Sequence, residues 1–394
     1  MRRARYPRHH LISAAAVACC LTIGAAPSAS AVDDPVSLPT VRTALGADEP
    51  CAGPSAETAR AEPWTRAAMS LSRAWQLTQG SGVLVAVVDT GVGADIPALQ
   101  GRVTHVGAAK PDCVGHGSFA AGLIAAAPGP GSGMAGVAPQ ARVLAVPGTD
   151  ERGITDGPAL ATAIRQAADA GAKVIYVARA VLDGRAELTK AVEYASERDA
   201  LIVAPVAPDA LPRGATGDQA AARPYFPAFL PKVVSVVDYG PDLARPTNAP
   251  EPFAADLAAP GDAVVSVGPR GAGHYIGSGS SFAAANVAGA AALVRARYPE
   301  LSADQTAARL ASTAYPADIP RLDPYAGLTA VAGGGAVDRR VEPARVDPKP
   351  DTAEGSRRTA LVVAGAALLL VLVLAAAVAI VPRGRARSWR AADR

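Results

Sequence analysis

Three residue types that together can carry out nucleophilic catalysis occur in this chain inside short glycine-rich motifs. Asp89 ends the apolar run VLVAVVD, His116 stands between two glycines in VGHGSFAAGL, and three serines crowd the stretch GSGSSFAAANVAGAAALV at 277–294. A serine hydroxyl becomes a nucleophile when an imidazole takes its proton and a carboxylate orients that imidazole. Each residue also has an ordinary alternative, because Asp forms turns, a lone His is usually structural and Ser caps helices.

The Asp-Thr-Gly sequence that starts at Asp89 also suggests an aspartic protease. Such enzymes need two carboxylates in one site, one protonated and one ionised. The chain contains a single D-T-G, so this interpretation would require a symmetric dimer. The order Asp, His, Ser along the chain instead favours acyl transfer by a serine, in the order used by subtilisin-type enzymes.

The elements that must position these residues follow from the hydrophobic pattern. Short apolar runs alternate with helical patterns, which is typical of βαβ units and a parallel sheet, and near-continuous Val and Ile suit strands covered on both faces. Active-site groups gather at the carboxyl ends of such strands. We expect an α/β fold with a mostly parallel sheet, strands at Val83–Asp89, Arg142–Pro147, Lys173–Ala178, Leu201–Val206 and Lys232–Val237, and helices at 64–79, 159–171 and 187–199.

The three motifs resemble the signature blocks of the subtilisin-like serine proteases. The similarity comprises VAVVDTGV, GHGSFAAGLIA and GSSFAAANVAGAAALV and covers roughly Trp64 to Asp338. It implies a subtilisin-like three-layer sandwich. It also implies that Ser281 is the nucleophile, that His116 is the general base and that Asp89 holds the imidazole in its catalytic tautomer.

One departure from the family pattern concerns the oxyanion hole. Subtilases complete this hole with an Asn side chain, and here that position falls on Pro208 or Asp209. Neither supplies the donor, because Pro has no N–H and an ionised Asp only accepts hydrogen bonds. The only two Asn of the chain, Asn248 and Asn286, match other positions. We expect the missing donor to reduce turnover by about 10²–10³, and Pro208→Asn to raise it.

A second departure concerns the substrate cleft. Ala178 and Arg179 stand where the family has a Ser-Leu-Gly segment, and Ala285 replaces a proline in the nucleophile helix. Arg179 either selects acidic substrates or obstructs the cleft. Two functions therefore remain open: a weak or selective serine endopeptidase, and a protease-like scaffold that stabilises a secretion complex.

Both ends of the chain carry export and membrane signals. A basic stretch, an apolar stretch and Ala29-Ser30-Ala31 predict a signal peptide. The apolar run at 359–381 measures about 35 Å as a helix, enough to span a bilayer. Five arginines follow it and two precede it, which favours a cytoplasmic C-terminus. We expect a single-pass type I protein of the cell membrane with an extracytoplasmic peptidase: signal peptide 1–31, N-terminal extension 32–62, peptidase domain 63–338, linker 339–358, transmembrane helix 359–381 and cytoplasmic tail 382–394.

The cysteines, the net charge and the spacing of possible metal ligands limit which partners and cofactors are expected. Only Cys51 and Cys113 are left after signal removal, and they form one disulfide or stay as two free thiols. The early Cys51 and the C-terminal anchor resemble the mycosins, the membrane-anchored subtilases of type VII secretion systems. The expected partners are thus a protein or peptide substrate and secretion membrane components. A net charge of +3 argues against nucleic-acid binding. No metal-ligand spacing is visible, and no cofactor is expected.

Overall fold

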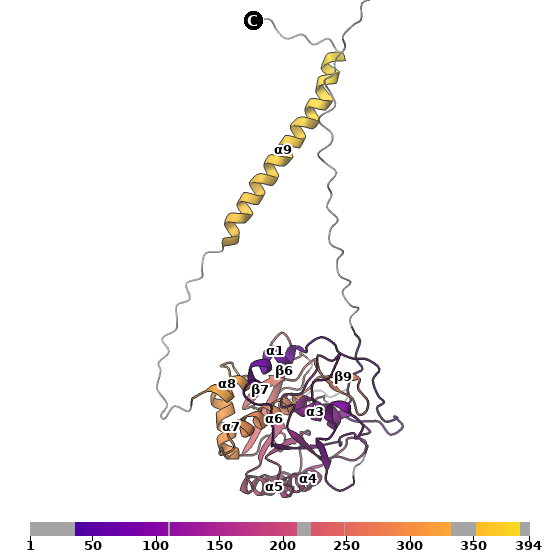
Figure 1. Cartoon of the computed structure of the whole chain (residues 1–394), viewed down its shortest axis with the longest axis vertical. Helices are drawn as coiled ribbons and strands as arrows, with labels where there is room; N and C mark the ends of the chain where they lie inside the picture. The colour runs from indigo at the N-terminus through magenta and orange to yellow at the C-terminus, as the bar shows by residue number, and fades with distance from the viewer. Residues whose placement is uncertain (1–35, 109–110, 211–221, 248, 332–351, 387–394) are drawn as a thin grey trace, which may run out of the picture. The chain divides into compact units, whose positions relative to one another are not determined.

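The computed structural model describes residues 36–108, 111–210, 222–247, 249–331 and 352–386, in two units that divide after Val331 (Figure 1). Each unit is considered by itself. The expected signal peptide, the linker up to residue 351, Asn248 and the tail beyond residue 386 lie outside the described residues.

The centre of the first unit is a parallel sheet with strand order β2-β3-β1-β4-β5-β6-β7. All five expected strands are present, with ends that differ from the prediction by at most two residues. Two further strands, β2 and β7, were not predicted, because β2 has only three residues and β7, although as long as β4, contains no β-branched residue. The strands are β1 (Leu84–Asp89), β2 (Val103–His105), β3 (Arg142–Pro147), β4 (Val174–Val177), β5 (Leu201–Pro205), β6 (Val233–Tyr239) and β7 (Leu257–Pro260).

Helices cover both faces of this sheet. In β1, Val85 and Val87 pack into the core that contains α3 (His116–Ala125) and α6 (Ser280–Arg297). Ala86 and Val88 face the other core, beneath α4 (Gly157–Asp169) and α5 (Arg185–Glu197), which lie together on one side in Figure 1. Strands buried on both faces explain the continuous Val and Ile runs. The predicted three-layer α/β sandwich is confirmed.

The single helix expected over 64–79 is interrupted. The structure has α1 (Trp64–Ala68) and α2 (Leu71–Ala74), and Ser70 between them adopts a left-handed conformation with φ 50°. Tertiary hydrogen bonds hold both pieces, because the indole N–H of Trp64 donates to Ala263 O and that of Trp75 donates to Val137 O. The remaining elements of this unit are η1 (Pro97–Leu99), β8 (Val264–Val267), β9 (His274–Gly277), α7 (Ala303–Ser312) and α8 (Pro324–Thr329).

The N-terminal extension follows the surface of the first unit without a helix or strand between residues 36 and 62. Val41 N–H donates to Ile276 O of β9 at 2.9 Å. Cys51 and Cys113 form a disulfide, which confirms the paired alternative. This bond joins the extension to the loop three residues before His116.

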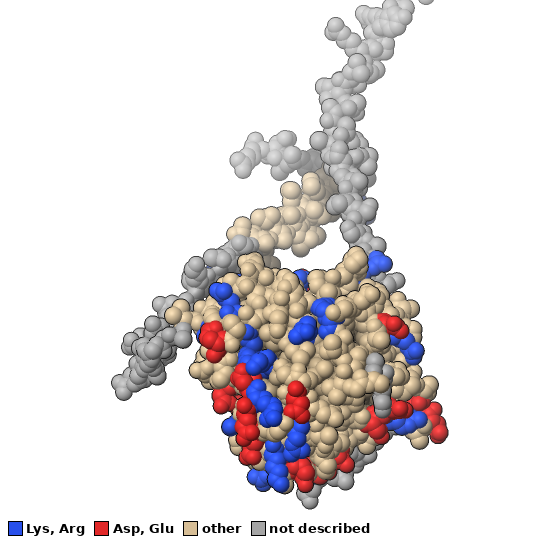
Figure 2. Space-filling model, turned by 60° about the horizontal axis from the view of Figure 1, so that its bottom comes forward, with Lys and Arg blue, Asp and Glu red and all other residues tan. Residues whose placement is uncertain are grey.

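Charged side chains are mixed on the face of the first unit shown in Figure 2, where basic and acidic residues alternate along one part of the surface. Because neither sign dominates, this face carries no broad field of one sign.

The second unit contains one long helix, α9 (Thr352–Ala386), which includes the apolar run. Within it, Arg358–Gly384 is the single candidate membrane span among the described residues, by length and composition. The helix begins at Thr352, so the last residues assigned by sequence to the linker are helical.

Candidate active site

Three elements bring the predicted catalytic residues together at the carboxyl edge of the sheet. Asp89 is the last residue of β1, His116 the first residue of α3 and Ser281 the second residue of α6, and all three are fully buried. Gly279, before α6, has φ 154°, and a Cβ there would lie 2.2 Å from the carboxylate of Asp209. The glycine therefore allows this turn to approach the neighbouring loop closely.

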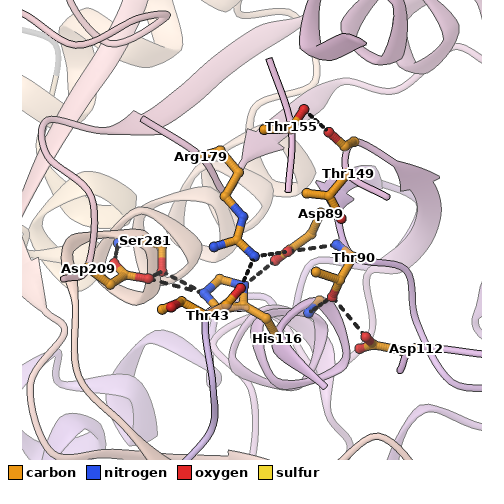
Figure 3. Close-up of polar contacts among 12 residues, drawn as sticks. Thr43, Asp89, Thr90, Asp112, His116, Thr149, Thr155, Arg179, Asp209 and Ser281 are labelled. Carbon is orange, nitrogen blue, oxygen red and sulfur yellow. Dashed lines mark hydrogen bonds and ion pairs between the residues drawn. The ribbon is translucent and has the colours of Figure 1, made fainter. Parts of the chain in front are cut away.

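The side chains of these residues form a continuous hydrogen-bonded chain (Figure 3). His116 Nδ1 lies 2.6 Å from Asp89 Oδ2, and His116 Nε2 lies 3.2 Å from Ser281 Oγ. Thr90 N–H donates to the other carboxylate oxygen of Asp89 at 2.7 Å. This is the geometry that a serine nucleophile, an imidazole base and an orienting carboxylate require.

Asp209 is the group opposite Ser281 and His116, at the place where sequence left Pro208 and Asp209 as alternatives. Its Oδ1 accepts a hydrogen bond from Ser281 N–H at 2.9 Å, and its Oδ2 accepts from Ser281 Oγ at 2.7 Å. The same Oδ2 lies 3.2 Å from His116 Nε2, and the side chain is only 4% exposed. The backbone N–H of Ser281, which in a serine protease donates to the oxyanion, is therefore already hydrogen-bonded to a carboxylate.

Two carboxylates control the charge of the imidazole. Burial lowers the pKa of His116, as does the charge of Arg179, but the charge of Asp89 and hydrogen bonds to Asp209 and Asp89 raise it to about 9. Burial raises the pKa of Asp209, but hydrogen bonds from His116 and Ser281 lower it overall. At neutral pH the site therefore holds an imidazolium between carboxylates, and the base already carries its proton.

Arg179, which sequence placed beside the cleft, points toward Asp89 (Figure 3). Its guanidinium lies 3.8 Å from Asp89 Oδ1 and donates to Thr43 O of the N-terminal extension at 2.5 Å. The side chain is 13% exposed. The extension and the active site are thus joined by a direct hydrogen bond, and the cation is turned inward.

Asp112 is a residue of the candidate site that the sequence reasoning missed. Its Oδ1 accepts from Gly115 N–H and Thr90 Oγ, each at 2.8 Å, and its Oδ2 accepts from Ser118 N–H at 2.8 Å and Ser118 Oγ at 2.7 Å. Asp112 thereby connects the residue after Asp89 to both sides of His116. The available signal was an Asp four residues before a Gly-flanked His.

The two asparagines do not change this picture. Asn286 is buried and its amide donates to Pro260 O at 2.9 Å, so the side chain is engaged inside the helix layer. Asn248 lies outside the described residues. Among the described residues, no group of three or more His, Cys, Asp or Glu side chains could hold a metal ion.

Comparisons with known proteins identify the family of the chain. The sequence profile of the subtilase family (Peptidase S8) matches residues 80–355. Mycosin-3 from Mycobacterium tuberculosis is 34% identical over 389 residues, which cover 80% of this chain and 83% of that protein. Thermitase from Thermoactinomyces vulgaris is 32% identical over 228 residues, which cover 56% of this chain and 78% of that protein.

Solved structures show the same relationship. The crystal structure of MycP1 from Mycobacterium smegmatis matches with a TM-score of 0.62 and 26% identity, over 77% of this chain and 93% of that chain. A chain of an intact ESX-5 inner membrane complex matches with a TM-score of 0.61 and 26% identity, over 86% of this chain and 100% of that chain. From its sequence motifs, its fold and these similarities, the chain belongs to the subtilase family of serine endopeptidases.

Proposed function

We propose that this chain is a membrane-anchored serine endopeptidase of low turnover, which cuts protein substrates on the outer side of the cell membrane within a type VII secretion complex. The observation that carries the proposal is the hydrogen-bonded chain from Asp89 through His116 to Ser281 Oγ. Structural hydrogen bonds alone would not require these three residue types in this order.

The reaction follows from the positions of these atoms. Ser281 Oγ attacks the peptide carbonyl carbon while His116 Nε2 accepts the hydroxyl proton, and the carbonyl electrons move to the oxygen. The C–N bond then breaks as His116 returns the proton to the leaving amine. Water repeats both steps on the acyl-enzyme and releases Ser281. Asp89 accepts from His116 Nδ1 throughout and stabilises the imidazolium.

Low turnover follows from Asp209. Its carboxylate replaces a donor of the oxyanion hole, and loss of one such donor reduces turnover by about 10²–10³. It also helps to keep His116 protonated, which leaves the base unable to accept the proton of Ser281.

The proposed location rests on α9 and on the relatives. The candidate span is long enough to cross a bilayer, and the arginines that follow the apolar run favour the inside. The Cys51–Cys113 disulfide suits an oxidising compartment. A similar chain occurs in the ESX-5 inner membrane complex, which supports secretion components as partners.

A second candidate function is a scaffold that stabilises such a complex without proteolysis. The contact of Asp209 Oδ1 with Ser281 N–H favours it, because a substrate carbonyl needs that N–H. In this case the triad would be retained but barely used.

A serine-directed fluorophosphonate probe distinguishes the two functions. We expect slow labelling of the detergent-solubilised full chain and none of Ser281→Ala, with equal thermal stability of both proteins as the control. If neither protein is labelled, and secretion in cells is restored equally by the wild type and by Ser281→Ala, the scaffold function is correct.

A further inference from the structure

We propose that Asp209 is itself a catalytic residue, which shares one proton with His116 and donates that proton as a hydrogen bond to the oxyanion. The proposal rests on the endopeptidase function proposed above. It assigns a positive role to a side chain that otherwise only blocks the hole.

Asp209 contacts both the nucleophile and the base. One carboxylate oxygen accepts from the N–H of Ser281, and the other is 2.7 Å from the nucleophile and 3.2 Å from the base. Because the carboxylate and the imidazole are in hydrogen-bond contact, a proton can move between them without leaving the site. No other described carboxylate contacts His116 Nε2 in this way.

Two arrangements of that one proton have the same net charge and opposite consequences. With the proton on His116, the base is occupied and the hole presents a negative oxygen. With the proton on Asp209, the imidazole is free to accept and the carboxyl O–H is a donor. A buried carboxylic acid that stays protonated can serve as an oxyanion-hole donor.

The chemical step uses only the substrate, Ser281, His116 and Asp209. The substrate carbonyl oxygen replaces Asp209 Oδ1 on the N–H of Ser281, and the neutral carboxyl turns to donate to the same oxygen. Ser281 Oγ forms the new C–O bond, its proton goes to His116 Nε2, and the carbonyl electron pair goes to the oxygen. When the tetrahedral intermediate collapses, His116 gives its proton to the leaving nitrogen, and Asp209 keeps its own.

The surroundings of Asp209 on the side away from His116 include an open space. A hollow of about 170 Å³ lies beside Asp209 and is lined on its other sides by the nucleophile turn and the loop before residue 250. The titratable or charged side chains that face the His116–Asp209 pair are Asp89 of β1, Tyr176 of β4 and Arg179 after β4. Asp238 of β6 and Asp262 after β7 line the hollow on the other side of Asp209.

Most of these neighbours are already engaged. Asp89 is bound to His116 Nδ1, and Asp238 accepts from Ser280 Oγ at 2.6 Å and lies 3.4 Å from Arg245. Burial raises the pKa of Tyr176 well above its usual value, so this phenol stays neutral. The proton shared between His116 and Asp209 is therefore the one whose loss changes the site.

This assignment predicts an unusual pH dependence. The active form needs one proton on the pair, so activity falls when that proton is lost and when a second is gained. The pKa of His116 is raised to about 9 and that of Asp209 is lowered, which gives a broad plateau that ends near pH 9. In Asp209→Asn only His116 of the pair titrates. The activity of this variant therefore rises with pH as His116 loses its proton and stays constant at higher pH.

The experiment is the rate of fluorophosphonate labelling of the full chain from about pH 4 to about pH 10.5. We expect the wild-type rate to fall about tenfold per pH unit above the alkaline limit, while the Asp209→Asn rate stays constant there. Asp262→Asn, which removes a charge from the same hollow, should keep the wild-type profile. Ser281→Ala reports background labelling at each pH.

The outcomes separate this proposal from the endopeptidase function. A wild-type rate that rises through pH 9 and does not fall overturns proton sharing, because Asp209 is then only an inhibitory charge. A wild type that is silent at every pH, beside an active Asp209→Asn, also overturns it but leaves the triad assignment intact. If Asp209→Asn fails to fold, the alkaline limb of the wild type still decides.

Discussion

His116 lies between two buried aspartates, and a comparison of its two sides explains the character of the site. On one side Asp89 is bound to Nδ1 at 2.6 Å, and on the other Asp209 lies 3.2 Å from Nε2. Both carboxylates favour the imidazolium. However, Nδ1 only needs to be oriented, whereas Nε2 must accept the proton of Ser281. The same chemical group therefore supports catalysis at one ring nitrogen and opposes it at the other while ionised.

The partners of the two carboxylates reinforce this difference. Asp89 accepts from Thr90 N–H and has Arg179 nearby, and it lies on the side of the imidazole away from Ser281. Asp209 accepts both of its strong hydrogen bonds from Ser281. We expect the same isosteric substitution, Asp to Asn, to have opposite effects at these two positions.

The largest expected effect is a loss at Asp89. In Asp89→Asn the amide favours the imidazole tautomer whose proton is on Nε2, which cannot accept the proton of Ser281. We expect the rate of fluorophosphonate labelling to fall by about 10⁴. The comparison is best made in the Asp209→Asn background, where the starting rate is high enough to measure the loss. A decrease of less than about tenfold would remove Asp89 from the catalytic chain.

The next largest effect is a gain at Asp209. Asp209→Asn supplies an amide donor to the oxyanion hole and removes a charge that helps to keep His116 protonated, so labelling at neutral pH should rise by about 10²–10³. Asp262→Asn is the matched control for loss of a nearby charge. The structure moves this test from Pro208, where the sequence placed it, to the residue that contacts Ser281. An unchanged rate would show that neither the charge of Asp209 nor the missing amide donor limits the wild-type rate.

The smallest expected effect concerns Asp112, whose hydrogen bonds join Thr90 to the residues on both sides of His116. Asp112→Asn keeps one acceptor oxygen but presents an NH₂ group to the N–H of Ser118. We expect unfolding to become easier by about 1–3 kcal/mol, measured by chemical denaturation, and labelling to fall less than in Asp89→Asn. Asp48→Asn, at an exposed turn, is the control. If stability is unchanged, Asp112 does not hold the two loops together.

Much of the fold could be predicted because its elements are local patterns. The Val and Ile runs of β1, β3 and β4 are buried on both faces, so they stand out in the sequence. The continuous helix expected from Trp64 was wrong, since the left-handed Ser70 and the two indole hydrogen bonds depend on distant parts of the chain. β2 has too few residues for a periodic signal, and β7, although as long as β4, lacks the Val and Ile that mark a buried strand.

The sequence by itself determined the chemical parts: a carboxylate, an imidazole and a hydroxyl, each at the end of a regular element whose pattern is local. Only the tertiary structure decided whether Pro208 or Asp209 contacts Ser281, and that Asp112 joins the two loops around His116. These contacts join residues in turns without periodicity, many positions apart. Their geometry depends on how β5, α3 and α6 pack at one edge of the sheet, because packing brings those loops within hydrogen-bond distance.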